Sequence, residues 1–183
     1  MLADTATPHI PVELELLPNC ATLPVFEEDA PTFAENAAGK ALHYSRFQEG
    51  MVFADDSGLV VPALGGAPGV HSARYAGVDA PNARRIEKLL HGMRALKAED
   101  RAAHFVCAIA LARNRRVLAI VTDGVDGCIL DAPRGTQGFG YDSVFYFPAL
   151  KKTFAELTAE EKNLHSHRGK AFGKLLAALP SML

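Results

Sequence analysis

Apolar and polar residues alternate along this chain in patterns that predict several β-strands. Val12–Leu17 places glutamates between apolar neighbours, the period-two pattern of a half-buried strand. Ala102–Ala112 and Val117–Thr122 are apolar runs separated by a polar turn, which predicts a β-hairpin. Two shorter strands are expected at Val125–Leu130 and Tyr141–Phe147. Residues 1–11 lack such periodicity, so we expect a loose start.

Helical patterns occupy the stretches between these strands. Thr32 opens a capping box, and the helix that follows is expected to run to about Phe47. Apolar residues recur at i, i+3, i+4 and i+7 from Ile86, which predicts a second helix over about 82–97. Near the C-terminus we expect one helix capped by Thr158 and a last helix over about 170–179.

The interleaving of helices and strands predicts the fold class. The hairpin excludes an all-parallel sheet, so the pattern indicates an α/β fold with an elongated mixed central sheet flanked by helices. The 183 residues, 49% hydrophobic and 22% charged, suffice for one well-buried core. We therefore expect a single domain over residues 1–183.

Charge and cysteine usage narrow the function classes. The net charge of -2 argues against a nucleic-acid binder with a broad basic surface, although a few local cations could hold a small anion. The longest apolar run, Phe105–Ala112, is too short to span a membrane. No basic segment of a secretory signal is visible at the start. Three scattered cysteines predict reduced thiols in a cytoplasmic protein.

Asp55 and Asp56 stand side by side inside an apolar stretch that predicts a buried strand. Adjacent buried carboxylates are unfavourable unless a cation, hydrogen bonds or water compensate them. Because neighbours on a strand point to opposite faces, the two aspartates are expected to have different roles. Beside Ser57, one of them could face a cleft. A polar turn at Asp-Ser-Gly explains the same residues equally well.

Three further groups are candidates for a nucleotide site, each with a structural alternative. Glu35 could ligate Mg²⁺ together with Asp56, or simply close the capping box. The Gly-x-Gly segment around Phe139 is a weak phosphate signal; its ring could stack on a base, but a core position in a turn is favoured by the pattern alone. Lys162, His167 and Arg168 flank a helix break, where an anion could bind or the charges could be solvated.

Several long motifs occur together and in order, and they carry a resemblance to a known family. They are Thr32–Ala37, Ala54–Leu59, Gly65–Tyr75, Gly138–Asp142 and Glu161–Gly169. From about Thr32 to its end the chain resembles the Ham1-like inosine triphosphate pyrophosphatases. The resemblance implies a homodimeric enzyme that uses Mg²⁺ to cleave ITP, dITP and XTP to the monophosphate and pyrophosphate. From the charge and the short apolar runs we expect no nucleic-acid or membrane partner.

The same resemblance implies roles for individual residues. Asp56 is expected to be the catalytic proton acceptor and a metal ligand, and Glu35 the second metal ligand. The residues expected to bind substrate are Ser57, Phe139, Gly140, Tyr141, Asp142, Lys162, His167 and Arg168.

One part of the family pattern is missing. Members of this family open with a strand and a Thr/Ser-x-Asn-x-x-Lys loop that holds the triphosphate, whereas no lysine precedes Lys40 here. A late start site, a truncation and a real loss would each explain the difference, and activity could be impaired. A nucleotide-binding protein without turnover and a Maf-like pyrophosphatase with other substrates are the alternatives.

Overall fold

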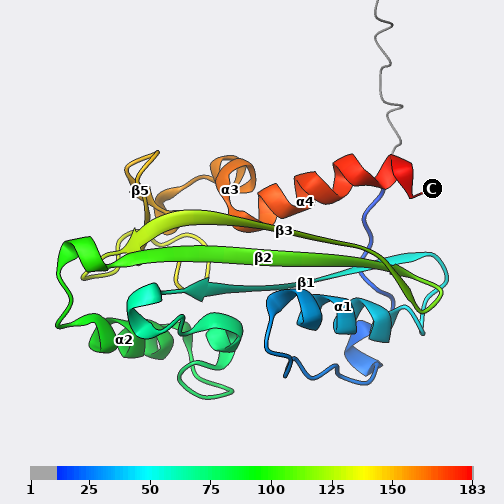
Figure 1. The fold of residues 1–183 in the computed structure, drawn as a ribbon, viewed down its shortest axis with the longest axis horizontal. Coiled ribbons are helices and arrows are strands. Elements are labelled where there is room, and N and C mark those ends of the chain that lie inside the picture. Colours follow the sequence, from blue (N-terminus) through cyan, green and yellow to red (C-terminus); the bar gives the residue numbers. More distant parts are fainter. Residues whose placement is uncertain (1–11, 183) are drawn as a thin grey trace, which may run out of the picture.

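Three long antiparallel strands run along the molecule and organise the rest of the chain (Figure 1). The computed structural model describes residues 12–182, so the expectations for residues 1–11 lie outside the described residues. The sheet has the order β1-β2-β3-β4-β5, and each neighbouring pair is antiparallel. Its strands are β1 (Met51–Val60), β2 (Ala102–Arg113), β3 (Arg116–Ile129), β4 (Phe145–Phe147) and β5 (Lys152–Thr153).

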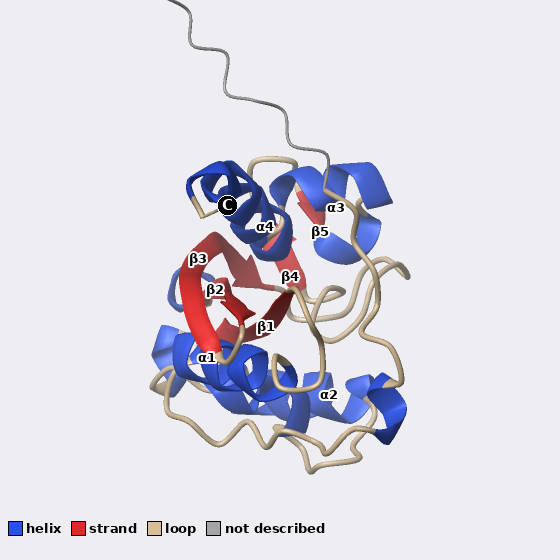
Figure 2. Ribbon diagram, turned by 90° about the vertical axis from the view of Figure 1, so that its right-hand side faces the viewer, coloured by secondary structure: helices blue, strands red, loops and turns tan. Residues whose placement is uncertain are grey.

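Helices cover both faces of this sheet, as Figure 2 shows. One layer contains α1 (Phe33–Tyr44) and α2 (Asn82–Met93), and the other contains α3 (Ala159–His165) and α4 (His167–Ala178). The predicted α/β fold with helices flanking a sheet is confirmed. The sheet was expected to be mixed, but its pairings within residues 12–182 are all antiparallel.

Hydrogen-bonding side chains set the helix starts. The Thr32 hydroxyl accepts the Glu35 backbone N–H at 3.2 Å, and Thr158 and Glu161 form a capping box at α3. These predicted starts are confirmed. The last helix begins at His167, before the predicted position 170, because the Ser166 hydroxyl accepts the Gly169 N–H and so caps it.

The hairpin between β2 and β3 turns within two residues. Asn114 and Arg115 have φ of 51° and 62°, the left-handed pair of a tight hairpin turn. The predicted hairpin is confirmed, but β3 is one strand through Ile129 rather than two. The Asp123-Gly124 dipeptide resembles a turn in sequence, yet these residues pair with Cys107 and Val106 and the ladder continues.

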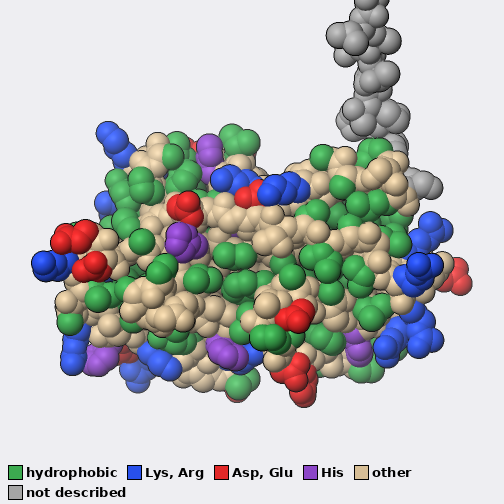
Figure 3. All heavy atoms as spheres, in the orientation of Figure 1, with side chains coloured by type: hydrophobic (Ala, Val, Ile, Leu, Met, Phe, Trp, Pro, Cys, Tyr) green, Lys and Arg blue, Asp and Glu red, His purple; other side chains and the backbone are tan. Residues whose placement is uncertain are grey.

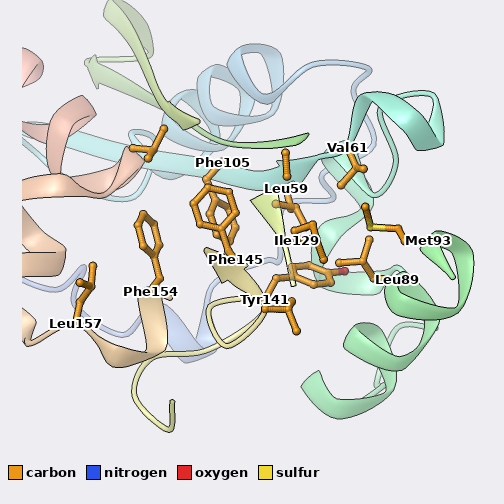
Figure 4. Close-up of a cluster of buried hydrophobic side chains, with 13 residues drawn as sticks. Leu59, Val61, Leu89, Met93, Phe105, Ile129, Tyr141, Phe145, Phe154 and Leu157 are labelled. Carbon is orange, nitrogen blue, oxygen red and sulfur yellow. The ribbon is translucent and has the colours of Figure 1, made fainter. Parts of the chain in front are cut away.

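The central strand β2 is buried on both faces. Cys107, Ile109 and Leu111 pack toward α4, and Ala108 and its alternate neighbours pack toward α1. Small alanines on that second face allow α1 to lie close to the sheet. A larger core cluster joins β1, β2 and α2, and in it Tyr141 extends toward Leu89 and Met93 (Figure 4).

Three local predictions are wrong. Val12–Leu17 forms no strand, and Leu16 is 94% exposed; its alternating pattern has no strand to pair with within the described chain. Only Phe145–Phe147 of the predicted strand Tyr141–Phe147 is extended, because Tyr141 sits in a turn. The polar turn considered for Asp55–Gly58 does not form, since β1 runs through it unbroken.

None of the helices within residues 12–182 combines the length and apolar character that crossing a membrane would need. All three cysteines are free.

Candidate active site

A cavity of about 740 Å³ lies between β1, α4 and the loop that leads into β4. Eight of the ten predicted site residues line it: Ser57, Phe139, Gly140, Tyr141, Asp142, Lys162, His167 and Arg168. Asp55, Ser72, Arg85 and Phe105 are among the other lining residues. Glu35 and Asp56 do not line it. The structure therefore joins the predicted substrate-binding residues and separates them from the predicted metal pair.

The alternation of β1 causes this separation. Asp55 and Ser57 pair in register with Ile109 and Cys107, whose side chains face α4. Asp56 pairs with Ala108, which faces α1. The expectation that the two aspartates lie on opposite faces is confirmed.

Asp55 is held by a cation from α4. Arg168 donates to its Oδ2 through Nε at 3.0 Å and Nη2 at 2.8 Å, and the Ser57 hydroxyl donates at 2.9 Å. Burial alone would raise the pKa of Asp55, but the charge and hydrogen bonds of Arg168 and the Ser57 hydroxyl lower it below its usual value. Asp55 is therefore ionised, and it forms an ion pair with the Arg168 guanidinium.

A second internal ion pair joins Lys162 to Asp142, which is buried. The Asp142 carboxylate also accepts the Phe139 backbone N–H at 2.7 Å. Gly138 has φ of 76°, and a Cβ there would collide with this carboxylate. The loop is thus folded around the ion pair.

Phe139 is 63% exposed at the edge of the cavity, so the core position favoured by the sequence pattern is wrong. The Lys162 ammonium lies 5.0 Å and the Arg168 guanidinium 5.7 Å from its ring centroid. Such a ring, backed by cations, is a stacking surface for a flat heterocycle.

His167 forms part of the cavity wall as a neutral ring. It is 8% exposed and stacks on Phe105, with ring centroids 4.6 Å apart and planes 11° from parallel. Burial, with the nearby charges of Arg168 and Lys162, lowers the pKa of His167 to about 3. Its Nδ1 is buried without a hydrogen-bond partner in the described chain. As a neutral ring, His167 carries one N–H and one unprotonated nitrogen, so this part of the wall suits a neutral heterocycle better than a charged group.

Asp56 lies on the α1 side and is 7% exposed. The Asn36 amide donates to its Oδ2 at 2.9 Å, and Glu28 is close enough for its charge to act on it. Burial, together with Glu28, raises the pKa of Asp56 despite the Asn36 hydrogen bond. Glu35, exposed at the start of α1, accepts the Thr32 hydroxyl at 2.7 Å.

The donors on this side suit a hard cation such as Mg²⁺. Within residues 12–182 no three acidic, histidine or cysteine side chains are grouped as a complete metal site. Mg²⁺, however, is commonly held by one or two carboxylates and completed by substrate phosphates and water. A buried carboxylate with a raised pKa gains most from a nearby cation. Asp56, with Glu28 or Glu35, fits that donor chemistry.

Comparison with known proteins identifies the family. The model of the Ham1 family matches residues 2–178. The chain belongs to the Ham1 family. A dITP/XTP pyrophosphatase from Geobacillus kaustophilus is 54% identical over 164 residues, which are 90% of this chain and 80% of that protein.

Solved Ham1 structures share the fold. A HAM1 protein from Coxiella burnetii has a TM-score of 0.82 and 45% identity, covering 87% of this chain and 82% of its own. The Ham1 protein of Staphylococcus aureus has a TM-score of 0.82 and 41% identity, covering 88% and 83%. The resemblance inferred from the sequence motifs is thereby confirmed.

Sequence reasoning missed two charged residues of the Ham1 cavity. Asp55 was recognised only as the neighbour of Asp56, and its Arg168 partner lies 113 positions away. Arg85 lies on α2, where the pattern predicted only an apolar stripe for the core, and no motif includes it. Only the arrangement of the folded chain reveals either contact.

Proposed function

We propose that this Ham1 chain hydrolyses deaminated purine nucleoside triphosphates (ITP, dITP and XTP) to the monophosphate and pyrophosphate. The observation that carries the proposal is the convergence of eight predicted substrate residues on one cavity. The relative from Geobacillus kaustophilus, a dITP/XTP pyrophosphatase, supports the substrate class.

The base would occupy the end of the cavity near Phe139 and His167. Phe139 offers an exposed ring for stacking, and His167 stays neutral through its burial. Lys162 supplies donors, which suit the carbonyl groups that deaminated purines carry in place of amino groups. Asp142 keeps Lys162 in position.

The phosphates would extend across the free edge of β1 to the α1 side. Within the described chain β1 pairs with a strand on one side only. On its other side, Pro68 bridges Val60 and the Ser72 hydroxyl accepts the Leu59 N–H at 2.9 Å, so the phosphates would pass along the earlier part of the strand, beside Asp55. Lys40 lies there and donates to the Asp55 carbonyl at 3.0 Å. This path brings substrate from the cavity to Asp56.

Asp56 would accept a proton from the attacking water as a general base. Asn36 would orient its carboxylate. Asp56 and Glu35 would hold Mg²⁺, with Glu28 close by. When bound, Mg²⁺ supplies positive charge that stabilises the phosphates as negative charge builds up on them.

The test measures pyrophosphate release from ITP and XTP with and without Mg²⁺, for the wild type and Asp56→Ala. General-base catalysis contributes about 10²–10⁴-fold, so we expect Asp56→Ala to lose at least about a hundredfold in kcat. Asp126→Ala, an exposed aspartate that contacts His104 on the same sheet, is the matched control and should retain activity.

Nucleotide binding without release of pyrophosphate by the wild type would refute the hydrolase and leave a binding protein. Release from ordinary or pyrimidine triphosphates alone would instead indicate a Maf-like activity.

We further propose a homodimer in the cytoplasm. Val117, Leu118 and Ile120 of β3 are exposed apolar side chains that a second copy could cover. The free thiols agree with a reducing compartment. Sedimentation at micromolar concentration should give a mass near twice 19.6 kDa, and a monomer would contradict the dimer.

A further inference from the structure

Arg85 reaches the cavity from α2, the helix layer opposite α3 and α4 (Figure 2). The other cavity cations come from the C-terminal helices. Arg85 therefore places a guanidinium on the α2 side of the cavity, across from Lys162 and Arg168.

The charges of the cavity do not cancel, and Arg85 is the reason. Lys162 is paired with Asp142, and Arg168 with Asp55. His167 is neutral. Among the lining residues that the structure describes, Arg85 alone is a cation without a carboxylate partner. A positive charge is therefore left for a ligand.

The guanidinium of Arg85 is held in place by one hydrogen bond, but one of its N–H donors has no partner in the described chain. Its Nη1 donates to the Asn82 side chain at 2.9 Å, whereas its Nε is buried with no hydrogen-bond partner in the described chain. Asn82 lies one helical turn earlier and thus limits where the group can point.

Arg85 belongs to the end of the cavity assigned to the base. The Tyr141 hydroxyl donates to the Ser72 carbonyl at 3.0 Å, and both residues line the cavity with Arg85. Burial raises the pKa of Tyr141, and Arg85 is near enough for its charge to oppose that rise. Tyr141 adjoins Asp142, the partner of Lys162.

We propose that Arg85 is a specificity-determining residue that favours xanthine over hypoxanthine in the base site. This inference rests on the proposed hydrolysis of deaminated purine triphosphates. A guanidinium only donates hydrogen bonds, so it suits a carbonyl and offers no partner to an amino group. Xanthine has one more carbonyl than hypoxanthine, and its ring loses a proton more readily. The unpaired charge of Arg85 suits both properties.

The experiment compares kcat/KM for XTP and ITP in the wild type, Arg85→Met and Arg85→Lys. Losing a hydrogen bond from a charged donor should lower kcat/KM for XTP about tenfold to a hundredfold. The value for ITP should change less than about threefold, and Arg85→Lys should be intermediate. Arg84→Met is the matched control, because Arg84 is the exposed neighbour on α2 that pairs with Glu87. It should leave both values unchanged.

An equal loss on both substrates would overturn the proposal, because it would place Arg85 at the phosphates or in the fold. No loss on either would also overturn it. A wild type that cleaves neither substrate would refute the proposed function instead. Calorimetric binding of XMP and IMP then tests Arg85 separately: Arg85→Met should weaken XMP binding selectively, and an unchanged ratio would refute its role.

Discussion

At the scale of single residues, partners decide what burial does to an ionisable group. Asp55 and Asp56 are adjacent, and burial acts to raise the pKa of both. The pKa of Asp55 is nevertheless lowered, whereas that of Asp56 is raised. Arg168 outweighs burial at Asp55, whereas Asn36 offers Asp56 only a neutral hydrogen bond. The chain thus obtains an ionised anchor and a more basic carboxylate from two neighbouring residues.

His167 should make stability depend on pH between its unfolded and folded pKa values. The folded pKa is lowered from 6.5 to about 3, so below 6.5 the unfolded state binds the extra proton and stability falls as pH falls. From pH 7 to pH 5 this amounts to about 2 kcal/mol. Urea unfolding of the wild type and His167→Phe at both pH values measures it.

The phenylalanine variant keeps a flat ring on Phe105 but cannot titrate. Its free energy of unfolding should therefore fall by about 2 kcal/mol less than that of the wild type. Identical pH dependence of the two proteins would show that the pKa of His167 is the same in the folded and unfolded states.

Residue types in the site were largely predictable, but their partners were not. Local motifs indicated Ser57, Lys162 and Arg168, and strand alternation predicted that the Asp55 and Asp56 side chains point to opposite faces of the sheet. The choice of Asp55 as the partner of Arg168 depends on how α4 lies over β1, which no local pattern specifies.

At the scale of elements, the β2–β3 hairpin carries a local conflict. Lys and Arg side chains gather at the end of the molecule where this turn lies (Figure 3). Arg113 and Arg116 are paired directly across it, and Arg115 takes a left-handed conformation that glycine adopts more easily. The fold tolerates this because the long ladder on either side fixes the turn.

Arg115→Gly should therefore raise the free energy of unfolding by about 1 kcal/mol, since it relieves the left-handed conformation. Chemical denaturation measures the change. Arg116→Gly is the contrasting control: it places glycine in an extended position of β3 and should lower stability by about 1 kcal/mol. A destabilising Arg115→Gly would mean that its side chain makes contacts worth more than the strain.

Element starts were easier to predict than element lengths. Side-chain caps at Thr32 and Thr158 are local and were read correctly. The length of β3 was not, because pairing with β2 overrides the turn preference of Asp123-Gly124. The strand predicted at Val12–Leu17 is absent because the segment has the alternating pattern of a strand but no strand to pair with in the described chain.

At the scale of the whole molecule, the cavity unites segments that only the complete sheet brings together. Strand β2 packs with α2 near its start and lies between α1 and α4 farther along, so neither end of the molecule has a sheet of its own (Figure 1). The fold class followed from the order of elements, but the meeting of β1 with the loop at 139–142 was implied only by the family resemblance.

This continuity predicts one cooperative unfolding transition, which also tests the single-domain interpretation. The chain has four tyrosines and no tryptophan, so tyrosine fluorescence reports on a few positions while far-UV circular dichroism reports on all helices and strands. The two urea curves should coincide. Separated midpoints would indicate two independently folding parts.

The internal ion pairs of the cavity have a consequence for ligand choice. Asp55 and Asp142 act as tethered competitors, already seated on Arg168 and Lys162 before any nucleotide arrives. A stray phosphate or chloride gains little by displacing them, because it exchanges one anion for another that is covalently attached nearby. Only a molecule that also stacks and hydrogen-bonds along the pocket can compensate for that exchange, so abundant simple anions are kept off Arg168 and Lys162.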